Sequence, residues 1–102
     1  MIRFREGAIR DIAEAARWYR RRRPAYEERF FERLAGTLRR IDEAPGSSAM
    51  AMEAEGVRKA RVLRSPYSIA YVVISEHEIE VVAVVHGAMR PGWWARRLRP
   101  SR

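Results

Sequence analysis

Basic side chains dominate the residues of this sequence that could take part in chemistry. Lys and Arg together number 21 against 13 Asp and Glu, for a formal net charge of +8, and Lys59 is the single lysine. His77 and His86 are the two histidines, the side-chain type that most readily exchanges protons near neutral pH. Because there is no cysteine, thiolate metal sites, disulfides and a cysteine nucleophile are excluded. With only two histidines we expect neither a metal site nor a cofactor.

The bases gather in two segments that contain no acid. The first, residues 58–64, holds Arg58, Lys59, Arg61 and Arg64. The second, residues 87–102, follows directly on His86 and includes Arg90, Trp94 and Arg97. Residues 24–57, by contrast, carry four arginines against seven acids. An excess of positive charge in so small a chain favours an anionic partner, either a nucleic acid or an acidic protein.

The chain of 102 residues has the length of one domain, and we expect residues 1–102 to form a single one. No apolar run approaches the roughly 20 residues that span a bilayer. The first residues show no apolar stretch after their charges, so we expect no signal peptide. These features predict a cytoplasmic protein.

The first half of the sequence has the spacing of helices. Ile2 to Arg5 alternates like an edge strand. Apolar residues then recur on one face from Glu6 to Arg22, and again from Pro24 to Glu43. Pro24 fits the first turn of a helix. We therefore expect two helices that pack as an antiparallel hairpin.

The second half changes to the two-residue period of strands. After a loop over residues 45–57, we predict strands from Val57 to Leu63, from Tyr67 to Ser75 and from Glu78 to His86. The short turn between the last two makes them antiparallel neighbours. Helices followed by strands indicate an α+β class, in which the hairpin covers one face of a small twisted antiparallel sheet and a basic C-terminal tail follows.

Motifs along nearly the whole chain resemble the RelE/ParE superfamily of bacterial type II toxin–antitoxin toxins. The N-terminal match is Ala8-x-x-Asp11-Ile12-x-x-Ala15-x-x-Trp18-Tyr19. The more specific matches are Pro66-Tyr67-x-Ile69-x-Tyr71 and His86-x-x-x-Arg90-Pro91-x-x-Trp94-x-x-Arg97. The resemblance implies the fold just described, residence in the bacterial cytoplasm, and a cognate antitoxin that is encoded alongside and binds the basic toxin.

The resemblance leaves two cellular targets open. RelE-like members cleave mRNA on the ribosome, a reaction that needs a base, a cation for the phosphorane charge and an acid for the leaving oxygen. Arg61, Arg64, His86 and Arg90 are the candidates for such catalysis. However, the tyrosine expected after the last strand is absent, and an indole cannot replace it as a general acid.

The ParE-like branch poisons DNA gyrase, has no hydrolytic centre, and carries the His…Arg-Pro…Trp tail found here. We therefore favour a gyrase inhibitor, with plasmid stabilisation as the role of the system. Residues expected to contact the target or the antitoxin are Arg58, Lys59, Arg61, Arg64, His86, Arg90, Trp94 and Arg97. A non-toxic basic binding module is a further alternative.

Overall fold

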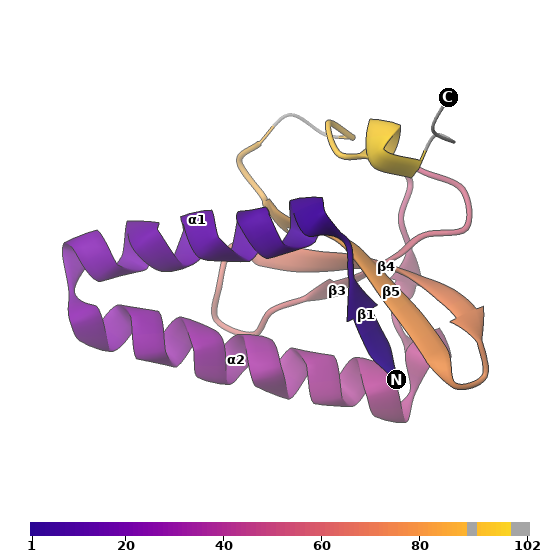
Figure 1. The fold of residues 1–102 in the computed structure, drawn as a ribbon, viewed down its shortest axis with the longest axis horizontal. Coiled ribbons are helices and arrows are strands. Elements are labelled where there is room, and N and C mark those ends of the chain that lie inside the picture. The colour runs from indigo at the N-terminus through magenta and orange to yellow at the C-terminus, as the bar shows by residue number, and fades with distance from the viewer. Residues whose placement is uncertain (90–91, 99–102) are drawn as a thin grey trace.

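The computed structural model describes residues 1–89 and 92–98. Two long helices, α1 and α2, lie beside a five-stranded sheet (Figure 1). The elements in chain order are β1 (Ile2–Phe4), α1 (Glu6–Arg22), α2 (Pro24–Glu43), the 3₁₀ turn η1 (Pro45–Ser47), β2 (Ala49–Met50), β3 (Arg58–Arg61), β4 (Tyr67–Ser75), β5 (Glu78–His86) and the 3₁₀ turn η2 (Ala95–Leu98). The predicted α+β class and element order are confirmed.

The helical hairpin forms where the sequence predicts it. The chain turns at Arg23, whose backbone N–H donates to the carbonyl of Tyr19 and closes α1. Pro24 then starts α2, where its missing N–H costs no helical hydrogen bond. Within the described residues, no helix is long and apolar enough to cross a membrane.

The sheet has the order β1-β5-β4-β3-β2 and is mixed. The strands β2 to β5 pair antiparallel as expected, whereas β1 pairs parallel to β5, with Ile2 opposite Ile79 and Phe4 opposite Val81. Only Arg5 separates β1 from α1, which packs along β5. β1 therefore pairs with the free edge of β5 and is an edge strand, as predicted. Because this pairing is parallel, the sheet is not purely antiparallel.

The segment between α2 and β4 differs in detail from the prediction. The expected loop over residues 45–57 contains η1 and the two-residue strand β2, which pairs with β3. Two residues are too few to show a period in the sequence. The predicted strand from Val57 to Leu63 is shorter, because only Arg58–Arg61 pair with neighbouring strands.

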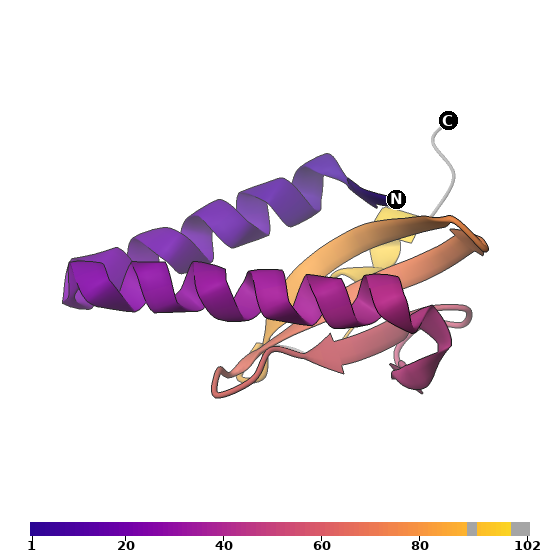
Figure 2. The same cartoon turned by 90° about the horizontal axis from the view of Figure 1, so that it is seen from below.

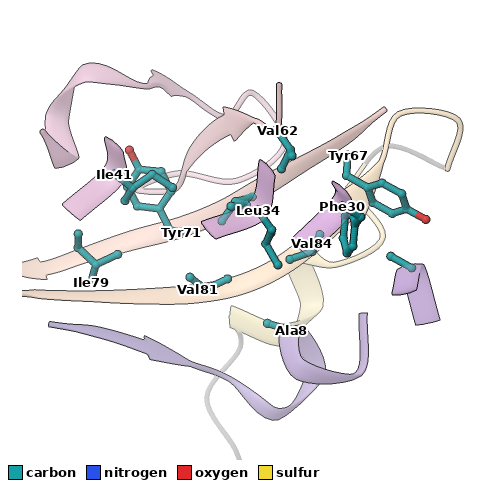
Figure 3. Packing of buried hydrophobic residues seen from close by; sticks show 12 residues of the cluster. Ala8, Phe30, Leu34, Ile41, Val62, Tyr67, Tyr71, Ile79, Val81 and Val84 are labelled. Atoms are coloured by element: carbon teal, nitrogen blue, oxygen red, sulfur yellow. The ribbon is translucent and has the colours of Figure 1, made fainter. Parts of the chain in front are cut away.

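Side chains from the hairpin and one sheet face form the larger core (Figure 3). Phe30, Leu34 and Ile41 of α2 meet Tyr67 and Tyr71 of β4 there. Tyr71 is fully buried, and its hydroxyl donates to the carbonyl of Pro45 at 2.6 Å. This bond ties the middle of the sheet to η1, the turn that follows α2.

A second core covers the opposite sheet face. Its members are Val57, Ala70, Val82, Ala83, Val85 and Trp94, with parts of the 51–57 segment and of the C-terminal tail packed against them. The turn η2 consequently lies across the sheet from α2 (Figure 2). We call these two sides the helix face and the tail face. The sheet is thus covered on both faces, and the C-terminal tail serves as a structural layer.

Candidate functional site

Strand β3 distributes its basic residues between the two faces of the sheet. Residues directly opposite each other in an antiparallel pair point to the same side. Arg58 lies opposite Tyr71, a residue of the helix-face core, whereas Lys59 lies opposite Ala70 of the tail-face core. Arg61 lies opposite Ser68, two residues from Lys59, and therefore shares its side. The four bases of residues 58–64 do not form one surface.

The side chain of Arg58 forms an internal hydrogen bond. Its guanidinium Nη1 donates to the carbonyl of Ser48 at 2.5 Å, so it holds the segment after η1 against β3. Arg61, at the end of the strand, is exposed, and no residue of the described chain forms an ion pair with it. Of these two predicted contact residues, Arg61 is therefore the one that the fold leaves available to a partner.

Lys59 forms an ion pair with a carboxylate that the sequence reading did not select. Its Nζ lies 2.7 Å from Oε2 of Glu53, and both side chains are partly buried. This hydrogen bond from Lys59 holds the pKa of Glu53 below its ordinary value, against the opposing effect of burial. The lone lysine is thus neutralised locally, and it ties the 51–57 segment to β3.

His86, the last residue of β5, stabilises the turn that follows it. Its Nδ1 accepts a hydrogen bond from the backbone N–H of Ala88 at 2.9 Å, so Nδ1 carries no proton in this arrangement. The imidazole also meets the ring of Tyr67 edge to face, with centroids 5.0 Å apart. These contacts give His86 a definite structural role at the start of the tail.

The tail face holds the cluster of titratable groups closest to a catalytic arrangement. Lys59 and His86 line a pocket of about 100 Å³ together with Glu53, Ser68 and Trp94. Lys59 and Glu53 neutralise each other, however, and the imidazole of His86 points toward the ring of Tyr67, its directly opposed partner on the helix-face side. This pocket resembles a set of internal contacts more than a prepared set of acid, base and oxyanion-stabilising groups.

Tyr67, the tyrosine nearest to this pocket, does not line it. It lies on the helix-face side of β4 in the aromatic cluster of Tyr19 and Phe30. Burial raises the pKa of its phenol, with smaller effects from Tyr19 and Glu14. Tyr67 is therefore the phenol beside His86, but it lies on the opposite side of the sheet from Lys59 and Arg61.

The adjacent residues Trp93 and Trp94 differ in burial. Trp94 is 1% exposed and is the largest fully buried side chain of the described residues. Trp93 is half-buried, and its ring faces the guanidinium of Arg97 at 4.7 Å. In this conformation Trp94 is a core residue, and its predicted contact with a partner would require the tail to detach.

Arg97 is held by an extensive set of internal contacts. Its guanidinium forms two hydrogen bonds with the carboxylate of Asp11 in α1, at 2.8 and 3.0 Å, and a third with the carbonyl of Val82 at 3.1 Å. Asp11 also accepts from the backbone N–H of Val84. Arg5 donates in turn to the carbonyl of Arg97. The predicted contact residue Arg97 therefore fastens the tail, whereas its neighbour Arg96 is exposed.

Arg64 and Arg90 are the remaining predicted residues. Arg64 is in the turn between β3 and β4, near the tip of the helical hairpin, and is exposed. Arg90 lies outside the described residues. The roles of all eight residues as contacts for a target or an antitoxin remain predictions. Within residues 1–89 and 92–98, no group of three or more metal-ligating His, Asp or Glu side chains comes together.

Three residues with clear roles were not selected as site residues from the sequence: Asp11, Glu53 and Gly7. Asp11 stands in the N-terminal motif that carries the family resemblance, which was the one available signal. Gly7 lies under the guanidinium of Arg97, and a Cβ at this position would approach Arg97 Cζ to 2.7 Å. The roles of Asp11 and Gly7 depend on contacts with Arg97, far away in the chain, which no local pattern encodes, whereas Glu53 contacts Lys59 six residues later.

Comparisons with known proteins agree with the motifs. The family model described as the ParE toxin of the type II toxin–antitoxin system parDE matches residues 2–91. Nine solved chains also match, among them one titled as the chromosomal ParDE toxin–antitoxin system from P. aeruginosa. That chain has a TM-score of 0.72 and 17% sequence identity, over 83% of this chain and 92% of that one, a level that supports the fold alone. No curated protein sequence matches.

Proposed function

Because this chain belongs to the ParE toxin family of type II toxin–antitoxin systems, we propose that it inhibits DNA gyrase in the bacterial cytoplasm. We propose further that an antitoxin encoded alongside neutralises it. The family membership over residues 2–91 is the observation that carries the proposal. Action on gyrase is the property that the family resemblance implies.

The arrangement of the tail face is consistent with inhibition by binding. Lys59 and Glu53 neutralise each other, and His86 Nδ1 accepts from the Ala88 backbone. Among the residues that the structure describes, the exposed bases Arg61 and Arg96 are available to contact a partner on this side. An inhibitor that acts by binding needs such surface charges, and it needs no acid–base set around His86.

Cleavage of mRNA is the second candidate, and one feature favours it. Arg61 lies on the same side of β3 as Lys59, which shares a pocket with His86. A phosphate near that pocket would meet the cationic groups of Lys59 and Arg61, the part of such a mechanism that stabilises the phosphorane charge. A basic binding module without toxicity is the remaining alternative.

Incorporation of labelled thymidine and leucine after tightly controlled induction separates these functions. Under the gyrase proposal, thymidine incorporation falls first and the SOS response follows. A fall in leucine incorporation within minutes, with DNA synthesis continuing, would identify the ribonuclease instead. Unchanged incorporation of both labels would leave the binding module.

Two variants refine the same experiment. His86→Ala should leave growth inhibition largely intact if gyrase is the target, whereas loss of the imidazole should abolish cleavage of mRNA. Arg96→Glu reverses an exposed charge of the tail without touching the contacts of Arg97, and we expect it to abolish inhibition. Arg39→Glu, which reverses an exposed charge on α2, is the matched control and should remain toxic.

A further inference from the structure

A pocket of about 200 Å³ opens between the tip of the helical hairpin and the turn that joins β3 to β4. It is distinct from the tail-face pocket and lies on the other side of the sheet. Its apolar lining comes from Tyr19, Tyr26 and Phe30, and three arginines, Arg29, Arg33 and Arg64, complete it. A concave surface that combines aromatic walls with several cations is suited to a specific ligand.

The floor of this pocket is preformed by the hydrophobic core. Phe30 is buried and stacks on Tyr19, with ring centroids 5.2 Å apart. Tyr67 lies behind Phe30 at 5.6 Å. Tyr26 stands at the mouth, partly exposed, with the guanidinium of Arg29 5.7 Å from its ring centroid. A ligand would therefore meet rigid aromatic surface that needs no rearrangement.

The arginines of the pocket have no carboxylate partner in the described part of the chain: no ion pair there includes Arg29, Arg33 or Arg64. Arg33 donates from Nη1 to the carbonyl of Arg64 at 3.2 Å, which fixes the turn against α2. Arg64 has a φ of 55°, a left-handed conformation that is uncommon for a residue with a side chain. The fold thus keeps three unneutralised guanidinium groups around one apolar hollow.

The dimensions and charge of the pocket define the ligand that fits it. A cavity of roughly 150 Å³ is enough to hold a benzene ring, so this pocket has room for a large apolar or aromatic side chain. Guanidinium groups prefer carboxylate or phosphate partners, which they bind through paired hydrogen bonds. The complementary ligand is an apolar group with acidic groups beside it.

The surroundings favour a protein segment over a nucleic acid. Glu27, Glu28 and Glu32 do not line the pocket but lie on the same helix as Arg29 and Arg33, and residues 24–57 carry more acids than bases. A phosphate backbone that extended from the pocket would run past these carboxylates and be repelled. A peptide, in contrast, can place one or two acids at the guanidinium groups and continue with neutral or basic residues.

We propose that this pocket receives a bulky apolar side chain of the antitoxin, flanked by carboxylates that bind Arg29 and Arg64. The proposal rests on the proposed function, in which such an antitoxin exists. It assigns part of the antitoxin contact to the hairpin tip, away from the tail-face residues that the motifs emphasise. Arg33 then acts as a positioning residue, since it holds the Arg64 turn.

Titration calorimetry with the purified antitoxin encoded beside this gene tests the proposal. Arg64→Gly removes one guanidinium and places glycine where a positive φ is favourable, so the fold is expected to tolerate it. We expect Arg64→Gly and Arg29→Gln each to weaken binding roughly tenfold or more, the usual effect of losing a charge-assisted hydrogen bond. Arg39→Gln, an exposed arginine on the same helix that does not line the pocket, should bind as the unmodified chain does.

The outcomes separate failure of the inference from failure of the proposed function. If the unmodified chain binds the antitoxin and neither pocket variant weakens binding, the pocket is not the docking site, while the toxin–antitoxin assignment stands. If the unmodified chain binds no antitoxin, the proposed function itself fails. If Arg64→Gly instead reduces salt-sensitive binding to duplex DNA while antitoxin binding is unchanged, the occupant is a nucleic acid and the proposal is overturned.

Discussion

The guanidinium of Arg97 binds both carboxylate oxygens of Asp11, 86 residues earlier in the chain. The same carboxylate accepts from the backbone N–H of Val84, and Arg97 also donates to the carbonyl of Val82. One ion pair thus connects α1, the tail and the backbone of β5. Its side chains are 9% and 23% exposed, so solvent screens it less than a surface pair.

Asp11→Asn and Arg97→Lys should each lower the free energy of unfolding by about 1–3 kcal/mol, because charge-assisted hydrogen bonds contribute about that much. Lysine keeps the charge at position 97 but cannot form the two parallel bonds. Urea denaturation gives the values. Arg96→Lys alters the exposed neighbouring arginine and should change the midpoint little. Equal effects at positions 96 and 97 would contradict the role of the ion pair.

Gly7→Ala tests the close approach of α1 to the tail. A Cβ at this position would lie 2.7 Å from Cζ of Arg97, which Asp11 and Val82 hold in place. We expect the substitution to displace Arg97 and to lower stability by about as much as breaking the ion pair, roughly 1–3 kcal/mol.

The effect of Gly7→Ala on the free energy of unfolding should change sign when Arg97 is replaced. In an Arg97→Ala background the clash is gone, and alanine in place of glycine in α1 should be neutral or stabilising by up to about 1 kcal/mol. A double-mutant cycle by urea denaturation measures this coupling. Additive effects of the two substitutions would show that Gly7 is not required by Arg97.

Trp94→Ala should be the most destabilising single substitution in the tail, at about 3–5 kcal/mol, because truncation of a large buried aromatic side chain leaves a cavity. Trp94 is 1% exposed and packs on the tail-face core. Thermal and urea unfolding provide the comparison with Trp93→Ala, which alters a half-buried neighbour and should cost less. A larger effect at Trp93 would reverse this assignment.

Protonation of Glu53 should loosen the 51–57 segment at acid pH. Lys59 holds the pKa of Glu53 below its ordinary value of 4.5. The stability that this pair contributes is therefore fully present above pH 4.5 and is lost as the pH falls through the lowered pKa. We expect a contribution of less than about 1 kcal/mol.

Urea midpoints measured from pH 7 down to pH 3 check this prediction. Glu53→Gln removes the titrating group and should flatten the pH dependence in the acid part of that range. Glu55→Gln changes an exposed acid two residues away and is the matched control. Identical pH profiles for the unmodified chain and Glu53→Gln would show that the pair contributes nothing to stability.

Sequence periodicity predicted the helices and the two long strands closely. The bounds of α1, α2, β4 and β5 all agree with the expected ones, because helix and strand periods, Pro24 and the short turn after Ser75 act within a few residues. The parallel pairing of β1 and the short strand β2 could not be predicted from the sequence. Their pairing depends on which strand they meet, and the residues near them do not specify that partner.

The sequence by itself determined the family, the α+β class and the excess of positive charge, since motifs, local periods and composition are written directly in the residues. Only the tertiary structure decided which bases remain available. It paired Arg97 with Asp11 and Lys59 with Glu53, and it buried Trp94. It also gathered Arg29, Arg33 and Arg64 around one aromatic pocket. The reason is physical: whether a charged side chain is neutralised depends on distances of a few ångströms in space, which separation along the chain does not fix.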